Sequence, residues 1–412
     1  MGRSRTARTT GGVALGLALA LALAACGDDG DSGSSGDTDD PGADLTGEPV
    51  KVMVTGVFTS FGEDYTQIPE AAQAAASAIE ADGGINGSPI EIIECDVAGP
   101  NEATECGRLA VQEEVVATVG TFSTNADDFL PVIEEAGIPQ VAPYPIAFSD
   151  YTSPVNYPLF GGSLSVVAGM GAQLADDGAE TLNVSYLNIA EGALAADLVK
   201  VGTDPRGAEV ISETPVAQDT VEFSPAVADA TADDPDGIAV LLTSRDSPGY
   251  LRALGQTGYE GKVATATSSI TPAQLEELGP LADGILIPSA FKPATMTDDP
   301  AVQEFNEEMD QYAPDAVRDD TAENAWLGMH LLADVMDGKG KVTAATVTKA
   351  LDETGKVDLG LIPPIDFQQG VTIDALAPGL ELRVFNTSVV YTVVENGELI
   401  ATTGEFVDVL EG

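Results

Sequence analysis

The sequence predicts an α/β fold built from mostly parallel sheets whose faces are covered by helices. One observation is Val50–Asp96, which has the pattern of a strand, a loop, a helix, a turn and a second strand, that is, one βαβ unit. Another is the repetition of this alternation along most of the chain, which indicates parallel strands joined by right-handed crossovers. The third is a change near the end, where apolar and polar residues alternate around Glu395-Asn396-Gly397, as expected of an antiparallel hairpin.

The first unit follows from its residue types. A β-branched run, Val50–Val57, is typical of a strand buried in a parallel sheet. After the loop Thr59–Gly62, apolar residues at helical spacing within Ile68–Ile79 form one stripe, which indicates a helix packed on the sheet. Gly83-Gly84 ends that helix, and Ile90–Ile93 is the next strand. The loop lies at the carboxyl end of its strand, where open α/β sheets bind ligands.

The same rhythm predicts the later elements. The expected strands are 115–120, 138–141, 181–187, 209–212, 237–243, 262–266 and 284–288. The expected helices include 101–114, 191–201, 224–232, 249–255, 271–278, 300–312, 321–336 and 343–353. The closing hairpin is expected to use 382–391, 392–395 and 399–407. The rhythm loosens at Tyr151–Gly162 and around Pro288–Pro293, where we expect the chain to cross between two lobes.

The N-terminus has the features of an export signal. Three arginines within Met1–Arg8 precede the apolar run Val13–Leu23, which is shorter than the roughly 20 residues of a membrane span. We therefore expect residues 1–25 to be a signal peptide. Cys26 follows Leu23-Ala24-Ala25 and resembles the cysteine of a bacterial lipobox, which becomes lipidated and N-terminal. The alternative is a plain signal peptide with a chance cysteine.

Residues 26–47 are expected to form the lipidated cysteine and a flexible acidic tether. Gly27–Asp44 has no large apolar side chain, so it cannot contribute to a core. Acyl chains would then anchor an exported protein to the extracytoplasmic face of the cell membrane without a spanning helix.

The charge of the chain excludes one class of partner. The formal net charge is −50, and the predicted signal contains three Arg and no acid. Its removal leaves 14 basic residues against 67 acidic ones, a net charge of −53. Such a protein repels phosphate backbones, so we expect no nucleic-acid partner. We interpret the acids as a solvated surface rather than as a recognition patch.

The cysteines indicate a structural crosslink. Once Cys26 is assigned to lipid, Cys95 and Cys106 remain as a pair in an oxidising compartment. A disulfide between them would close a short loop and contribute about 3 kcal/mol in the chain-entropy treatment. Two cysteines and one histidine do not make a plausible zinc site, so we expect no metal.

Motifs for catalysis are weak or missing in the sequence. Gly161–Ser165 lacks the closing glycine of a G-x-S-x-G elbow, and there is no Walker loop and no H-E-x-x-H. The single histidine, His330, has apolar neighbours on a predicted helix, which favours a structural role, and Trp326 is expected in the core. We therefore expect neither an enzyme nor a cofactor.

Several stretches together resemble a known family. Behind the lipobox and the acidic linker, the chain is similar to bacterial solute-binding lipoproteins of the leucine/isoleucine/valine-binding type of periplasmic binding proteins, which feed ABC importers. The resemblance rests on VKVMVTGVFTSFGEDYTQ, ADGGINGSPIEIIECD and VATVGTFST, and more weakly on GYLRALGQTGYEGKV and LADGILIPSAFKP. The most specific signature is GGINGSPIEI, and the likeness spans roughly residues 50–367.

The resemblance implies a two-lobed type I fold with three hinge crossings, closing on a small molecule. Lobe 1 would hold 48–162 and about 289–365, and lobe 2 would hold 163–288 and about 366–412. The implied partners are a small-molecule solute and the membrane subunits of an ABC permease.

The resemblance also implies ligand-binding residues in lobe 1. Beside Ser60, Phe61 stands where the family usually has an aromatic residue that covers the ligand. Ser123 and Thr124 occupy the loop whose hydroxyls and backbone amides hold a ligand carboxylate.

The next loop of lobe 1 departs from the family pattern. It contains Tyr144, Pro145 and Ile146, where a threonine that helps to hold the ligand is common. Ile146 has no hydroxyl and cannot replace that threonine.

Lobe 2 departs further from the family pattern. Asn188 follows the strand after which a tyrosine is common. The acid that usually holds a ligand ammonium would fall near Thr267–Ser269, where no residue is acidic. A buried ammonium without a counter-charge costs several kcal/mol, which argues against a zwitterionic amino acid. Arg245 and Asp246 are the nearest charged candidates; Arg245 could fork onto a carboxylate, or the two could form a surface pair with no part in binding.

Three functions remain open from the sequence. The leading hypothesis is a lipid-anchored receptor that delivers an amino acid, amide or carboxylate to an ABC permease. The second is a sensor or scavenger with the same fold and no transporter. The third is an exported hydrolase, for which the loops offer no catalytic constellation.

Overall fold

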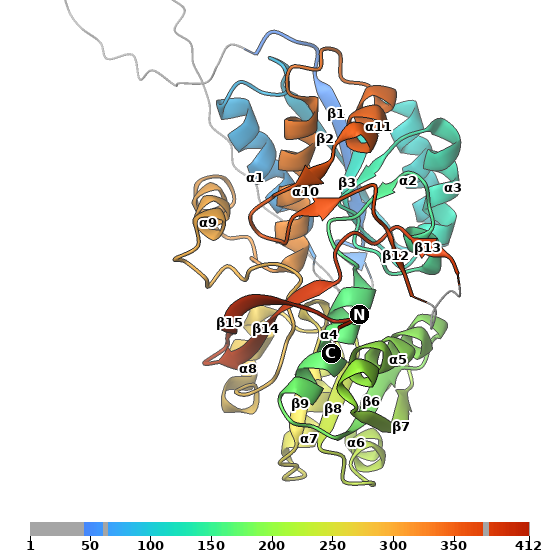
Figure 1. Cartoon of the computed structure of the whole chain (residues 1–412), viewed down its shortest axis with the longest axis vertical. Helices are drawn as coiled ribbons and strands as arrows, with labels where there is room; N and C mark the ends of the chain where they lie inside the picture. Colours follow the sequence, from blue (N-terminus) through green and yellow to red (C-terminus); the bar gives the residue numbers. More distant parts are fainter. Residues whose placement is uncertain (1–44, 61–64, 374–378, 412) are drawn as a thin grey trace, which may run out of the picture. The chain divides into compact units, whose positions relative to one another are not determined.

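The computed structural model describes residues 45–60, 65–373 and 379–411, and it contains two parallel sheets (Figure 1). The first sheet has five parallel strands in the order β2-β1-β3-β4-β5. Their bounds are β1 Val50–Gly56, β2 Ile90–Asp96, β3 Ala117–Phe122, β4 Gln140–Val141 and β5 Asn156–Tyr157. The predicted βαβ unit is therefore confirmed, and β1 lies between β2 and β3 with its apolar side chains buried.

Helices cover both faces of the first sheet. Figure 1 shows α1 (Gln67–Ala81) and α10 (Asp320–Met336) on one side of the strands, with α2 (Pro100–Gln112) and α3 (Ala126–Ala136) on the other. The predicted apolar stripe of α1 is buried along its whole length, from Ile68 to Ile79. Burial of such a stripe supplies most of the stability of a helix packed on a sheet.

The second sheet repeats this arrangement with four parallel strands in the order β7-β6-β8-β9. Two apolar clusters lie on its opposite faces: one includes Leu182 and Val184 of β6, and the other includes Ile238 and Val240 of β8. The strands are β6 Thr181–Leu187, β7 Glu209–Val216, β8 Gly237–Leu241 and β9 Lys262–Thr265. The helices are α4 Ser163–Asp176, α5 Ala190–Thr203, α6 Ser224–Ala230, α7 Ser247–Gly255 and α8 Pro272–Leu278.

The chain returns to the first sheet after the second. We name Pro288–Thr295 the second crossing, because α9 (Pro300–Tyr312) and α10 then pack on α1, and α11 (Ala344–Glu353) packs on α10. Phe291 of this crossing is fully buried against Phe160, which precedes α4, with ring centroids 5.2 Å apart. The two aromatic rings hold neighbouring crossings together.

The predicted strand 284–288 is not a regular strand. Leu286 makes one parallel bridge to Ala264 and one antiparallel bridge to Val393, and Ser289 bridges Val390. Gly284 has φ +86°, a left-handed conformation that starts the segment with a turn. The segment therefore joins β9 to the C-terminal hairpin instead of extending the sheet.

The C-terminal hairpin is confirmed, although it begins at Ser388 and not at the predicted residue 382. Its strands are β14 (Ser388–Glu395) and β15 (Glu398–Asp408), and the turn residues Asn396 and Gly397 have φ +53° and +85°. Positive φ at both positions is the geometry of a two-residue hairpin turn. The residues before it form two short ladders: β10 Lys356–Val357 with β11 Ile365–Asp366, and β12 Val371–Thr372 with β13 Glu381–Leu382.

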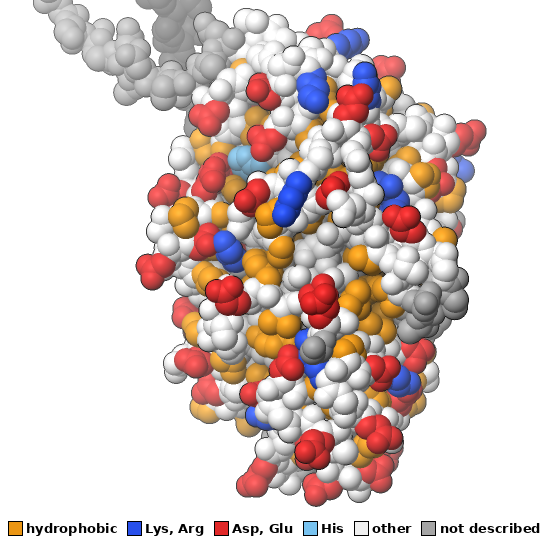
Figure 2. All heavy atoms as spheres, in the orientation of Figure 1, with side chains coloured by type: hydrophobic (Ala, Val, Ile, Leu, Met, Phe, Trp, Pro, Cys, Tyr) orange, Lys and Arg blue, Asp and Glu red, His pale blue; other side chains and the backbone are white. Residues whose placement is uncertain are grey.

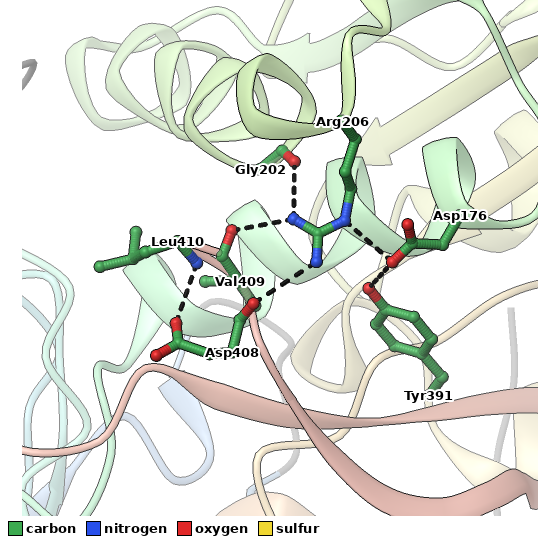
Figure 3. A network of polar contacts seen from close by, with 7 residues as sticks. All are labelled: Asp176, Gly202, Arg206, Tyr391, Asp408, Val409 and Leu410. Atoms are coloured by element: carbon green, nitrogen blue, oxygen red, sulfur yellow. Dashed lines mark hydrogen bonds and ion pairs between the residues drawn. The ribbon is translucent and has the colours of Figure 1, made fainter. Parts of the chain in front are cut away.

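Arg206 fastens the end of the hairpin to α4 and α5 (Figure 3). Its Nε donates a hydrogen bond to Asp176 Oδ2 at 2.8 Å, and its Nη1 donates to the carbonyls of Gly202 and Val409, each at 3.2 Å. Tyr391 donates its hydroxyl to the same oxygen of Asp176 at 2.7 Å. The Arg206 side chain is only 6% exposed, so these contacts are shielded from water.

Three further predictions from the sequence are confirmed. Cys95 at the end of β2 and Cys106 in α2 form a disulfide, with their Cα atoms 5.8 Å apart. Trp326 lies in the core, 3% exposed, and His330 has a structural partner. Glu308 accepts hydrogen bonds from Trp326 Nε1 at 2.7 Å and contacts His330 Nε2 at 2.9 Å.

The acids are dispersed over the surface that Figure 2 shows. Red acidic side chains are scattered across this face, with fewer basic side chains among them. This distribution is what a solvated acidic surface requires, because dispersed charges repel one another less than gathered ones.

We predict that Arg206→Ala loosens the C-terminal hairpin. The variant removes a buried charged donor shared by α4, α5 and β15, and should lower the free energy of unfolding by about 1–3 kcal/mol. Hydrogen exchange of the β15 amides should accelerate. Arg252→Ala is the matched control, because Arg252 pairs with Glu277 at an exposed site and should change little. Unchanged protection of β15 in Arg206→Ala would contradict this role.

Candidate ligand-binding site

The loops after β1, β3, β4 and β9 come together at the carboxyl ends of their strands. Tyr65, which follows β1, donates its hydroxyl to the Ser268 carbonyl after β9 at 2.9 Å. The Tyr65 ring lies 4.8 Å from the ring of Phe122, whose ring lies 5.1 Å from that of Tyr144. Tyr144 in turn packs on Phe160 at 4.9 Å. Open α/β sheets bind ligands at this end of their strands, so these loops mark the region to search.

Two acids at the start of α10 are held by distant parts of the chain. Asp319 caps the helix by accepting hydrogen bonds from the backbone of Thr321 and Ala322, each at 3.0 Å. Gln67 of α1 donates to the other oxygen of Asp319 at 2.9 Å. Asp320 accepts hydrogen bonds from the second crossing: 2.7 Å from the hydroxyl of Ser289 and 2.9 Å from the backbone of Ala290.

A third acid, Glu323, lies one turn further along α10 and has no such support. The side chain is 1% exposed, and neither carboxylate oxygen accepts a hydrogen bond from a described residue. Burial raises its pKa well above the ordinary value, and repulsion from Asp320 and Asp319 raises it further. A buried carboxylate of this kind is held neutral unless a positive charge comes close.

The neighbouring acids are shifted in the same direction. Burial raises the pKa of Asp320 to about 7, although Ser289 and Ala290 hydrogen-bond to it. Burial also raises the pKa of Asp319, against the opposing effect of hydrogen bonds from Thr321, Ala322 and Gln67. Near neutral pH the start of α10 therefore carries protons that would leave if a cation bound there.

A cavity of about 310 Å³ opens beside these acids. Its wall is formed by the start of α10 and its preceding loop, α8, the second crossing and the hairpin turn. The acids in the lining are Asp315, Asp319, Asp320, Glu323 and Glu398, and the apolar lining includes Ile270, Pro272, Leu275, Ile287, Pro293, Ala294, Ala316, Val317 and Leu399. Among the described residues of the lining, Arg318 has the only positive charge, and it is paired with Asp310 and hydrogen-bonded to Asn306.

Of the site residues predicted from the sequence, Thr267 lies at this cavity. It is 6% exposed, and its hydroxyl is one of the groups that lower the pKa of Asp320 against the larger effect of burial. Tyr144 and Pro145 are buried in the neighbouring loop, and the Ile146 backbone donates to Asp150 Oδ2 at 3.0 Å. Gly162 of the first crossing packs against this loop, with φ +55°, and an added Cβ would lie 2.1 Å from the Pro145 carbonyl oxygen.

The predicted residues after β1 and β3 lie in two further loops. The Ser60 hydroxyl donates to Asp96 Oδ2 at 3.3 Å. Ser123 is buried and accepts a hydrogen bond from the Asn125 backbone at 3.0 Å, whereas Thr124 is exposed. Phe61 lies outside the described residues, as does Cys26.

The predicted residues after β6 and β8 do not line the cavity. Asn188 is exposed. Arg245 donates two hydrogen bonds to Asp246, from Nε to Oδ1 at 3.0 Å and from Nη2 to Oδ2 at 3.1 Å. It also donates a hydrogen bond to the Gln218 carbonyl. The Arg245 guanidinium therefore binds the carboxylate of Asp246 in the geometry that it would use for a solute carboxylate.

The sequence analysis missed Asp319, Asp320 and Glu323. The family pattern places a ligand-binding acid in the loop near Thr267, whereas the acids beside Thr267 come from a helix more than 50 residues later. One signal was available: Glu323 falls on the apolar face of α10, next to the buried Ala322 and near the buried Trp326. An acid on a buried helix face is rare enough to call for a partner.

Comparison with known proteins identifies the family. The periplasmic binding protein family matches residues 50–374, which is most of the chain. The chain therefore belongs to that family, and its two helix-flanked parallel sheets have the type I periplasmic-binding-protein fold predicted from the sequence. Proteins of this family are periplasmic binding proteins and not enzymes, so the chain is a binding protein that acts outside the cytoplasm, as predicted.

Individual relatives are more distant. An amino acid binding protein of Pseudomonas aeruginosa is 39% identical over 92 residues, which cover 22% of this chain and 24% of that protein. A crystal structure described as a possible leucine/isoleucine/valine-binding protein from Rhodopirellula baltica SH 1 has a TM-score of 0.73 at 17% identity, covering 89% of this chain and 99% of that one. A fatty acid ABC transporter substrate-binding protein from Thermomonospora curvata also has a TM-score of 0.73 at 17% identity, covering 88% and 93%.

Two negative findings apply to the described part of the chain. Residues 45–60, 65–373 and 379–411 contain no group of three or more His, Cys, Asp or Glu side chains that could hold a metal ion. Within the same residues, no helix has the length and apolar character needed to cross a membrane.

We predict that Glu323→Gln stabilises the protein as the pH rises. The pKa of Glu323 is higher in the folded state than in the unfolded state. Its contribution to the free energy of unfolding is therefore fully present below the unfolded-state pKa and is lost as the pH rises towards the folded-state pKa. Gln has the shape of protonated Glu and stays neutral at every pH. The free energy of unfolding of the variant should therefore rise relative to that of the wild type by about 1.4 kcal/mol per pH unit across that window. Urea unfolding at pH 5, 6, 7 and 8 measures the difference. A constant difference at all four values would show that Glu323 does not titrate as described.

Proposed function

We propose that the chain is the lipid-anchored, solute-binding component of an ABC importer. Membership of the periplasmic binding protein family supports the binding role. The lipobox-like sequence before Cys26 and the acidic stretch Gly27–Asp44 support a lipid anchor and a tether, which would keep the protein near its permease at the membrane surface.

The proposed solute is a small polar organic molecule: an amino acid, an amide or a carboxylate. The single observation that carries the proposal is the cavity beside Thr267, because its volume of about 310 Å³ suits a small solute and its lining combines apolar side chains with polar ones. Of the contact residues proposed from the sequence, Thr267 lines this cavity. The other proposed contacts lie in the loops after the strands: Ser60, Phe61, Ser123, Thr124, Tyr144, Pro145, Ile146, Asn188, Arg245 and Asp246.

The proposed site lies between two lobes that the crossings connect. Lobe 1 would comprise 48–162 and about 289–365, with the first sheet, and lobe 2 would comprise 163–288 and about 366–412, with the second. The hydrogen bond from Tyr65 to Ser268 supports this division, since it joins a loop of one sheet to a loop of the other at their carboxyl ends. A sensor or scavenger without a transporter would use the same site.

We predict that the full chain gains thermal stability from its solute. In a thermal-shift panel of amino acids, amides and carboxylates, a solute at a hundredfold excess over its Kd should add about 2.7 kcal/mol to the free energy of unfolding. Phe61→Ala and Thr124→Ala should weaken that shift while the far-UV circular dichroism stays the same. A panel without any shift would contradict the proposed solute classes, and full shifts in both variants would contradict the proposed contacts.

A further inference from the structure

We propose that Glu323 is the anchor for a protonated nitrogen of the solute, and that the site takes a small amine with an apolar body. This inference rests on the proposed solute-binding function and names a further class of solute for the same protein. It supplies from α10 the counter-charge that the loop at Thr267–Ser269 lacks.

Glu323 has hydrogen-bonding capacity that the described residues do not use. A carboxylate has two acceptor oxygens, and buried polar groups in folded proteins are nearly always hydrogen-bonded. Both oxygens of Glu323 are buried and accept nothing from a described residue, although the side chain lines a cavity. A ligand with N–H donors is the chemical complement of such a pair of oxygens.

The neighbouring acids already accept hydrogen bonds, which leaves Glu323 as the free acceptor among the three. Asp319 is bound by Gln67 and by the helix backbone, and Asp320 is bound by Ser289 and Ala290. These contacts fix the start of α10 against α1 and the second crossing, so the position of Glu323 is set before a solute arrives. A preorganised acceptor binds more tightly because less ordering is needed on binding.

Most of the charged side chains that line the cavity are acidic. On α10 itself Asp319 and Asp320 face Glu323, the preceding loop contributes Asp315, and the hairpin turn contributes Glu398. Arg318, the positive charge among the described lining residues, is engaged by Asp310 and Asn306. α8 and the second crossing contribute apolar and hydroxyl side chains to the lining. A cation that enters the cavity stabilises the charged form of these carboxyl groups, whereas a carboxylate solute does not, and the effect is strong because the interior has a low dielectric constant.

The lining of the cavity also contains apolar side chains. Ile270, Leu275, Ile287 and Leu399 are among the apolar residues that line the cavity. An aliphatic body of a few carbons would contact them and leave water. A quaternary nitrogen has no N–H to give to the Glu323 oxygens, so the geometry favours a primary or secondary amine.

The test compares three probes of one shape on the full chain: 3-methylbutylamine, 3-methylbutan-1-ol and 3-methylbutanoate. Calorimetry at pH 7 should show the amine binding at least about tenfold more tightly than the alcohol and the carboxylate. Glu323→Gln should remove that preference, and Glu323→Asp, which keeps the charge, should retain part of it. Asp334→Asn is the matched control, because Asp334 is an exposed acid on the same helix that does not line the cavity, and it should behave as wild type.

The outcomes separate this inference from the proposed function. Equal amine affinity in wild type and Glu323→Gln would overturn the inference. Tighter binding of the alcohol or the carboxylate would also overturn it, while leaving a solute-binding protein in place. Failure of these probes together with failure of every amino acid, amide and carboxylate in the thermal-shift panel would overturn both.

Discussion

The hydrogen bonds that hold Asp319 and Asp320 are the constraint on which the arrangement of the site depends. They join three parts of the chain that are far apart in sequence: α1 through Gln67, the second crossing through Ser289 and Ala290, and the start of α10. Asp320 is buried and Asp319 is half-buried, so removing a partner of Asp320 would leave a polar group without water or protein to bind it. These hydrogen bonds therefore fix the second crossing against the start of α10. Both segments line the cavity, so their position sets its shape.

Asp319, Asp320 and Glu323 lower the stability of the fold, and their presence therefore points to a function. Three carboxyl groups within one turn of α10 have pKa values raised by burial, and Glu323 lacks even the hydrogen bonds that offset burial for its neighbours. An apolar residue at 323 would pack as well and would carry no such penalty. Natural proteins break the rules of stable packing mainly at functional sites, where the loss of stability accompanies a gain in binding.

Much of the fold could be predicted because its signals are local. The βαβ alternation, the stripe of α1 and the Asn396-Gly397 turn each depend on residues close together in sequence, and the structure confirms all three. The disulfide followed from having two cysteines in an oxidising compartment. The irregular segment around Leu286 was not predicted, because its bridges to Ala264 and Val393 depend on partners from two other parts of the chain.

The site was harder to predict for the same physical reason. Thr267 could be placed at the end of a strand from local pattern, but the acids beside it arrive through the packing of α10 on α1. No spacing in the sequence connects Thr267 to Glu323. The pairing of Arg245 with Asp246 was one of two alternatives in the sequence, and the structure shows the two side chains in contact with each other.

The most direct measurement is the number of protons released when an amine binds at pH 7. Calorimetry of 3-methylbutylamine in buffers with different ionisation enthalpies gives that number. A cation beside Glu323 and Asp320 lowers their pKa values, so the account predicts a net release of protons that Glu323→Gln reduces. Binding with no proton exchange, or with the same release in Glu323→Gln, would contradict the claim that the acids of α10 hold the solute.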